Sequence, residues 1–155
     1  MSFRVYISHS VAPHELGAIY GMAELAAKKG MEPILPDRRW QPGPPPARIQ
    51  QSLRGLDAFV AVATHSGQHL EWVNAELAAA MTLGLKPQNL VSMVDEGLLV
   101  PPAGEVVTIN RRDFQTTMRQ AVGILERLQM DQRQRNLLAG LLLGGLIAIL
   151  LASRE

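Results

Sequence analysis

The sequence contains no cysteine, and this absence excludes several kinds of chemistry at once. Without a thiol the chain has no disulfide, no zinc–thiolate centre and no cysteine nucleophile. The absence also agrees with a reducing compartment. Catalysis, if the chain performs any, therefore depends on oxygen and nitrogen side chains.

A surplus of charge of one sign is also lacking. Lys and Arg together number 15 and Asp and Glu 14, so the formal net charge is +1. Proteins that bind nucleic acid usually carry a clear basic surplus, so we do not expect nucleic acid as a partner. The first residues, from Met1 to Ser8, have neither the apolar stretch nor the cleavage site of a secretory signal. We expect the N-terminal part to be cytoplasmic.

The end of the chain differs sharply from the rest. From Asn136 to Ser153 no residue is charged, and the run Leu137–Ala152 is apolar on every face of a helix. A helix over the whole uncharged segment, from Asn136 to Ser153, would cover about 27 Å, just under the roughly 30 Å of hydrocarbon in a bilayer. The 155 residues have room for one compact domain and this appendage. We predict a domain over residues 1–132 and a C-terminal transmembrane anchor over residues 133–155.

The charges around the apolar run predict its orientation. Arg133 and Arg135 precede the run, so the positive-inside rule places the domain in the cytoplasm and residues 137–153 in a membrane. Two alternatives stay open. The segment could be a core helix, or it could pack against copies of itself through Gly140, Gly144 and Gly145.

Strand-like and helix-like patterns alternate ahead of the anchor. The strands are expected at Phe3–Ser8, Glu32–Pro36, Ala58–Ala63, Asn89–Val94 and Val106–Ile109. The helices are expected at Pro13–Lys29, Ala47–Leu56, Leu70–Leu83 and from Asp113 to about Met130. Parallel neighbours need crossover connections, so the pattern predicts an α/β fold. We expect a flavodoxin-like, five-stranded parallel sheet with helices on both faces.

Ligands of such sheets bind beyond the carboxyl ends of the strands. Polar residues follow several predicted strands at that point, in the segments Ser8–Ser10, Asp37–Pro46, Thr64–Ser66 and Asp95–Glu96. Each residue alone is an ordinary loop or cap residue. Together they are expected to converge on one rim.

Trp72 and Glu76 form a more specific pattern. Their four-residue spacing on a helix puts the indole and the carboxylate on one strip, one turn apart, near the rim. An aromatic surface beside an acid suits a flat cationic ligand, and a carboxylate stabilises positive charge that develops at a sugar carbon. A half-buried Trp with a solvated Glu is the ordinary alternative.

From about Phe3 to Met130 the chain resembles the TIR (Toll/interleukin-1 receptor) family, in its bacterial type. The resemblance depends on several ordered blocks, which are Val5–Ser10, Asp37–Gly43 with Ile49, Asp57–Val62, Trp72–Leu77 with Gly84, and Leu90–Asp95. The block Val5–Ser10 resembles the first strand of the family, and Asp37–Gly43 resembles its BB loop. The block Trp72–Leu77 resembles the helix that carries the acid of catalytically active members.

The resemblance implies a function and a set of site residues. Glu76 would be the catalytic acid of an NAD⁺ glycohydrolase or cyclase, which releases nicotinamide and ADP-ribose or a cyclic form. Trp72 would stack on the nicotinamide, and Ser8, His9 and Ser10 would line the floor of the pocket. Trp40 would cover the nucleotide or meet a neighbouring subunit. NAD⁺ is then a substrate, and no metal or other cofactor is required.

Further expectations and alternatives come with the family. TIR domains associate with one another, so the resemblance implies self-association, signal transduction and a role in bacterial antiviral defence. Many members are interaction or adaptor modules without catalysis, which is one alternative. A nucleoside deoxyribosyltransferase-like enzyme, with the same sheet and a Glu near a sugar carbon, is another. His65 and His69 have the spacing of a metal pair, but no third ligand is evident, and we interpret them as loop residues.

Overall fold

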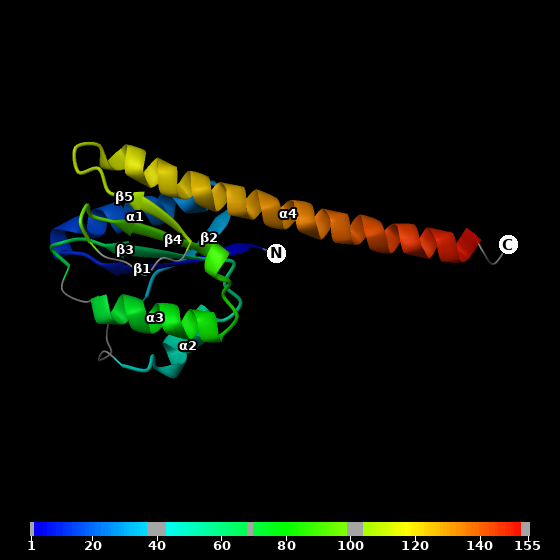
Figure 1. Ribbon diagram of the computed structural model, residues 1–155, viewed down its shortest axis with the longest axis horizontal. Coiled ribbons are helices and arrows are strands. Elements are labelled where there is room, and N and C mark those ends of the chain that lie inside the picture. Colours follow the sequence, from blue (N-terminus) through cyan, green and yellow to red (C-terminus); the bar gives the residue numbers. More distant parts are fainter. Residues whose placement is uncertain (1, 37–42, 68–69, 99–103, 153–155) are drawn as a thin grey trace.

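The computed structural model describes residues 2–36, 43–67, 70–98 and 104–152, with side chains as far as residue 141. One five-stranded sheet forms the centre, and its strands run in the order β2-β1-β3-β4-β5, all parallel (Figure 1). The strands are β1 (Phe3–Ser10), β2 (Met31–Ile34), β3 (Ala58–Ala63), β4 (Leu90–Val94) and β5 (Glu105–Thr108). The helices are α1 (Leu16–Lys28), α2 (Ala47–Leu53), α3 (Leu70–Thr82) and α4 (Phe114–Ala152), with 3-10 turns η1 (Pro13–Glu15) and η2 (Pro87–Asn89).

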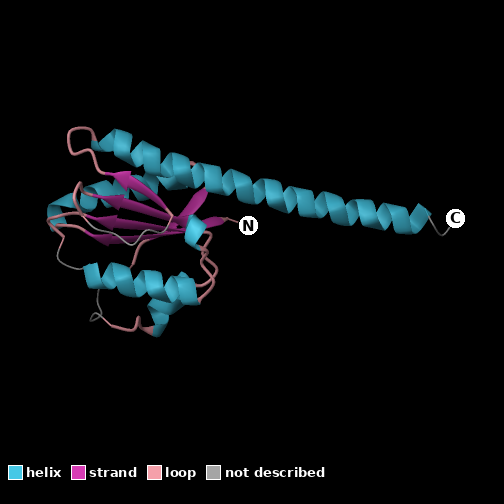
Figure 2. Cartoon of the chain, in the orientation of Figure 1, coloured by secondary structure: helices cyan, strands magenta, loops and turns pink. Residues whose placement is uncertain are grey.

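The prediction of an α/β fold with a five-stranded parallel sheet is confirmed, and a flavodoxin-like arrangement fits it coarsely. Helices lie on both sides of the strands (Figure 2). β3 and β4 are buried along their whole length because both faces are covered, which explains their unbroken apolar sequence. The predicted ends differ by a few residues. For example, β1 continues to Ser10, and α2 stops at Leu53.

The sheet separates two apolar cores. Val5 and Ile7 of β1 belong to the core under α1 and α4. Tyr6, between them, belongs to the core under α2 and α3. Successive side chains of a strand point to opposite faces, so this alternation assigns every residue of β1 to one helical layer or the other. The layer under α3 is the one that matters for the predicted site.

The helix α4 begins where its first turn is capped and extends well past the sheet. Asp113 Oδ1 accepts the backbone N–H of Thr116 at 3.2 Å, which is the usual cap for an exposed first turn. The helix is continuous over 39 residues and so extends past Met130, where the sequence predicts that it leads into the anchor. Gln132 donates from Nε2 to Asp57 Oδ1 at 2.8 Å, and this is the last described hydrogen bond from α4 to the body.

Beyond Gln132 the described leucines of α4 are exposed. The exposed fractions are 65% for Leu137, 58% for Leu138 and 64% for Leu141. These three residues therefore do not belong to a core of this chain, which excludes that alternative for them. In the part of the chain that is described, no helix is both long and apolar enough to cross a membrane. The side chains from residue 142 onward lie outside the described residues, and the anchor and the boundary at residue 132 stay predictions.

Candidate functional site

Glu76 lies in the interior, between α3 and β1. Its exposed fraction is 0%, as are those of Tyr6 and Ser8. Ser8 Oγ donates to Glu76 Oε1 at 2.7 Å, and the Tyr6 hydroxyl donates to Oε2. Each carboxylate oxygen therefore accepts a hydrogen bond from β1, which offsets the cost of burying the acid.

The positions of these three residues follow from local geometry. Tyr6 and Ser8 are two residues apart in β1 and so point to the same face, the one that α3 covers. Glu76 lies on the inner strip of α3 with Val73 and Ala80, which are three and four residues away and are also buried. The ordinary alternative, a half-buried Trp with a solvated Glu, is therefore wrong for Glu76, because its strip of the helix faces the sheet.

The phenol ring of Tyr6 is held in place by an aromatic neighbour in β3. Its ring stacks on Phe59, its register partner in β3, with centroids 5.5 Å apart and planes at 19°. A stacked, buried ring has little rotational freedom. The hydrogen bond that it gives to Glu76 is therefore preorganised by the central strands.

Trp72 precedes Glu76 by one turn of α3 and is half-buried. Its spacing places it on the same side of the helix, as the sequence indicated. The indole therefore combines a packed part with an accessible part.

The remaining β1 residues of the predicted site are divided between the two faces. Ser10 shares the face of Tyr6 and Ser8 and is 3% exposed, while His9 falls on the opposite face, that of α1 and α4. Gly67 packs on the end of β1, where a Cβ added to it would stand 2.0 Å from the carbonyl oxygen of Ser10. The structure thus brings Ser8 to Glu76, leaves Ser10 further along the same face, and separates His9 from both.

Two predicted residues lie outside the described part of the chain. These are Trp40, in the predicted BB loop, and His69, which we interpret with His65 as a loop residue. Among the described residues, no three His, Asp or Glu side chains are grouped so that they could hold a metal ion.

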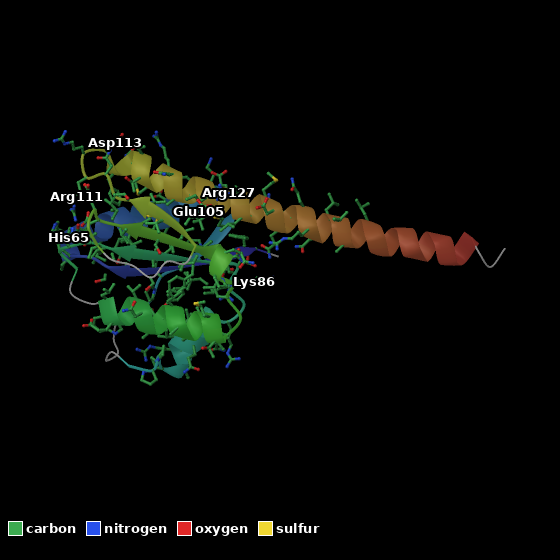
Figure 3. All side chains as sticks on the ribbon, in the orientation of Figure 1. His65, Lys86, Glu105, Arg111, Asp113 and Arg127 are labelled. Atoms are coloured by element: carbon green, nitrogen blue, oxygen red, sulfur yellow. The ribbon has the colours of Figure 1, made fainter. Side chains whose placement is uncertain are left out.

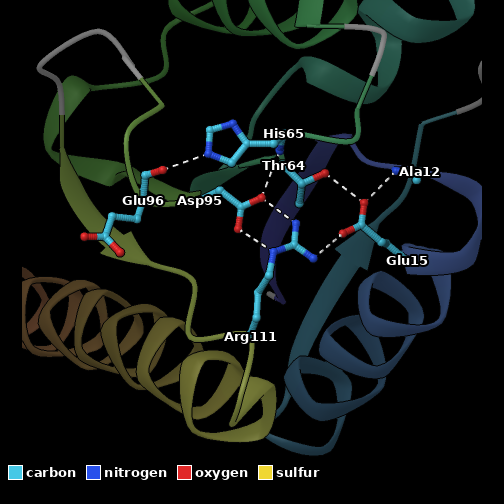
Figure 4. Close-up of polar contacts among 7 residues, drawn as sticks. All are labelled: Ala12, Glu15, Thr64, His65, Asp95, Glu96 and Arg111. Atoms are coloured by element: carbon cyan, nitrogen blue, oxygen red, sulfur yellow. Dashed lines mark hydrogen bonds and ion pairs between the residues drawn. The ribbon is translucent and has the colours of Figure 1, made fainter.

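A second polar network occupies the carboxyl rim on the other side of the sheet (Figure 4). Arg111 lies between two acids, 3.1 Å from Glu15 and hydrogen-bonded from Nε to Asp95 Oδ1 at 3.0 Å. Thr64 Oγ1 donates to Glu15 Oε1 at 2.8 Å, and the His65 backbone N–H donates to Asp95 Oδ2 at 2.9 Å. Of the segments predicted to converge on this rim, Thr64–Ser66 and Asp95–Glu96 meet here, joined by Glu15 and Arg111. Ser8–Ser10 instead belong to β1, and residues 37–42 of the Asp37–Pro46 segment lie outside the described residues.

The network moves the pKa values of its acids. Burial raises the pKa of Asp95, but the hydrogen bonds from Arg111 and from the His65 backbone outweigh it, so the net pKa lies below the ordinary value. Burial also raises the pKa of Glu15, and hydrogen bonds from Ala12, Thr64 and Arg111 again lower it overall. The pKa of Arg111 is raised, chiefly by its hydrogen bond to Asp95. All three groups are ionised at neutral pH.

The rim network is better suited to holding the fold than to binding a ligand. Arg111 is neutralised by two carboxylates, so it has no charge left for an anion. A hollow of about 150 Å³ opens beside Glu15, Thr64 and Arg111. This is below the roughly 300 Å³ at which small-molecule pockets usually start.

Sequence reasoning missed three of these polar residues, namely Tyr6, Glu15 and Arg111. Tyr6 had a usable signal, because its spacing from Ser8 in a predicted strand puts both on one face. Arg111 follows the last predicted strand and so had to lie near the rim. Glu15 had no such signal, because it falls inside a segment whose pattern predicts only a helix.

A search of known protein families and of curated proteins found no match to this chain. Chemical function is therefore argued from the site. The site consists of a buried carboxylate, two hydroxyl groups that donate to it and an aromatic side chain one turn away on α3.

Proposed function

We propose that this chain is a membrane-anchored, TIR-like NAD⁺ glycohydrolase or cyclase in which Glu76 is the catalytic carboxylate. The observation that carries the proposal is the hydrogen-bonded group of Tyr6, Ser8 and Glu76, with Trp72 one turn away on α3. The resemblance to TIR domains supplies the substrate. Bacterial defence and activation by self-association belong to the proposal through the same resemblance.

The chemistry requires little beyond a fixed negative charge. The bond between the ribose anomeric carbon and the nicotinamide nitrogen breaks, and its electron pair neutralises the departing pyridinium ring. Positive charge then develops on the ribose, where an anionic Glu76 lowers its energy. Water completes the hydrolysis, or a nucleophilic atom of the same nucleotide closes a ring. Trp72 would stack on the nicotinamide before departure.

Tyr6 and Ser8 are positioning residues in this proposal. Their hydrogen bonds fix both oxygens of Glu76, so the charge needs no reorientation when the transition state forms. Glu76 is fully buried in this conformation, so access to a ribose requires an opening above the carboxylate that keeps its hydrogen bonds to Tyr6 and Ser8.

The same burial favours a second candidate, a TIR-like interaction module. In that case the two hydrogen bonds to Glu76 simply fasten α3 to β1, and the domain acts by contact with other copies or partners. The deoxyribosyltransferase alternative would use the same carboxylate on a different nucleoside.

Nicotinamide release from NAD⁺ distinguishes these candidates. The full chain is tested in vesicles at high surface density, because assembly of TIR domains needs crowding. Release by wild type and its loss in Glu76→Gln support the glycohydrolase. Exchange of bases between deoxynucleosides, with no action on NAD⁺, would indicate the transferase, and no turnover of either would favour the interaction module.

We also propose that residues 137–153 anchor the protein in a membrane, with residues 1–132 in the cytoplasm. The exposure of Leu137, Leu138 and Leu141 supports this. Deleting residues 137–155 leaves Gln132 and its hydrogen bond to Asp57 in place. The shortened chain should stay folded and leave the membrane fraction, whereas a full-length chain that is soluble without detergent would contradict the anchor.

A further inference from the structure

The helix α4 leaves the body at the end of the sheet where the strands begin (Figure 1). Its rise of roughly 1.5 Å per residue puts Leu137 about 8 Å beyond Gln132. A bilayer that receives Leu137 and the leucines after it would then lie about one Debye length from this end of the domain. At that distance, charges on the body itself interact with lipid headgroups.

Two hollows flank α4 just before its exposed leucines. One, of about 320 Å³, is lined by Lys86 and Arg135 together with other residues. The other, of about 390 Å³, is lined by Arg4 and Arg133. Both are bordered by Gln132 of α4, so each places an arginine of the helix opposite a cation from the body.

Four cations at this end are exposed, and among the described side chains none has a carboxylate within ion-pair distance. They are Arg54, Lys86, Arg133 and Arg135, and we call them the basic end. Two of them, Arg54 and Lys86, come from connections between strands and helices far from α4 in the sequence. The basic end is therefore a property of the folded domain.

The acids nearby are mostly engaged. Glu32 lies 3.8 Å from Arg4, and Glu105 pairs with Arg127. Asp57 accepts hydrogen bonds from Gln132 and from the Arg4 backbone N–H. Asp131 is an exposed acid at this end, and it does not balance the four cations of the basic end.

The opposite end of the molecule has a different character. His65, Arg111 and Asp113 lie there, far from Lys86 (Figure 3). Arg111 is neutralised by Glu15 and Asp95. Arg112 is an exposed cation at that end, but it lies beside Arg111, far from the exit of α4. Among the described side chains, the unpaired cations nearest to an anchored bilayer are therefore those of the basic end.

We propose that the basic end docks the domain on an anionic bilayer, with Lys86 and Arg54 reaching lipid phosphates beside Arg133 and Arg135. This inference uses the proposed anchor only to place a bilayer beside the basic end, and it is independent of NAD⁺ cleavage. In the docked domain the strands stand at a steep angle to the membrane plane, and their carboxyl ends point into the cytoplasm. Substrate and neighbouring domains would then reach that rim without obstruction by lipid.

Vesicle flotation of the full chain tests the docking surface. The partition of the protein is compared between neutral phosphatidylcholine vesicles and vesicles with about one third phosphatidylserine. Each cation near an anionic surface strengthens binding by about fivefold. We expect Lys86→Gln and Arg54→Gln each to lower the preference for anionic vesicles by about fivefold and the double variant by about 25-fold. Arg112→Gln, which removes an exposed cation at the other end, is the matched control and should change nothing.

The outcomes separate docking from anchoring. If the double variant loses the preference for anionic vesicles but binds neutral vesicles as wild type does, the protein has both the docking surface and the anchor. If wild type binds only anionic vesicles and the double variant binds neither kind, the result supports the docking surface and contradicts the anchor. The docking surface would be wrong if Lys86→Gln and Arg54→Gln both prefer anionic vesicles as strongly as wild type does. It would also be wrong if Arg112→Gln lowers this preference as much as they do.

Discussion

Ser8 Oγ donates to Glu76 Oε1 at 2.7 Å, across 68 positions of sequence. The contact joins the first strand to the third helix, and the Tyr6 hydroxyl reinforces it at the other carboxylate oxygen. A buried acid held in this way either fastens two elements together or keeps a charge ready for a substrate. Substitutions that alter the charge, the donors or the surrounding backbone separate these roles.

Glu76→Gln tests whether the charge matters for turnover. The amide keeps the volume, one acceptor and the helix propensity, and its two hydroxyl partners accept as well as donate, so we expect a stability loss of only about 1 kcal/mol. If the charge stabilises the transition state, nicotinamide release falls about a hundredfold or more. Glu71→Gln, on the exposed side of α3, is the matched control. Equal turnover in wild type and Glu76→Gln would contradict the assignment.

Tyr6→Phe removes one donor to Glu76 and keeps the ring that stacks on Phe59. We expect a loss of about 1–2 kcal/mol in unfolding free energy, because a buried acid loses one of its hydrogen bonds. If Tyr6 also positions the carboxylate, kcat falls about tenfold while KM changes little. Tyr20→Phe serves as control, since Tyr20 is 58% exposed on α1. A change in stability with unaltered kcat would limit Tyr6 to a structural role.

Much of the fold could be predicted because its signals are local. The apolar run Ala58–Ala63 and the glycines and prolines that punctuate the chain give the order of strands and helices directly. The placement of Trp72 and Glu76 on one strip also follows from spacing alone. Strand ends were less certain, because β1 continues through polar Ser8 and His9 to Ser10.

The burial of Glu76 could not be predicted, because it depends on which side of α3 faces the sheet. Helical spacing puts Glu76 on one strip with Val73 and Ala80, but only packing on β1 decides that this strip faces the sheet. The Arg111 network is similar. Its members come from separate connections, and their distances depend on strand order, which sequence periodicity does not contain.

Gly67→Ala probes the support of the β1 end near the candidate site. An added Cβ would stand 2.0 Å from the Ser10 carbonyl oxygen and 2.7 Å from its hydroxyl oxygen, so the backbone must move. We expect a loss of about 1–3 kcal/mol, measured by thermal or denaturant unfolding. Gly17→Ala is the contrasting variant, because nothing lies within 4 Å of its added Cβ. That variant should gain up to about 1 kcal/mol from helix propensity, and the same loss in both would contradict the close packing of Gly67.

Arg111→Gln should destabilise the protein near neutral pH and much less in acid. In the folded state burial raises the pKa of Asp95 and of Glu15, and hydrogen bonds that include those from Arg111 lower both below the ordinary values of 3.8 and 4.5. A depressed folded-state pKa contributes stability above the unfolded pKa and loses it as pH falls through the folded one. Wild type therefore loses this contribution as the pH drops below about 4, whereas the variant has less to lose.

The measurement is the difference in unfolding free energy between wild type and Arg111→Gln across that pH range. Because the guanidinium is half exposed, we expect a difference of about 1–2 kcal/mol near pH 7, less than for a fully buried ion pair. It should narrow as pH falls from about 5 toward 3. Arg112→Gln, which removes a neighbouring exposed cation, should stay close to wild type throughout. A difference that does not change with pH would mean that Arg111 contributes by packing, and not through the two carboxylates.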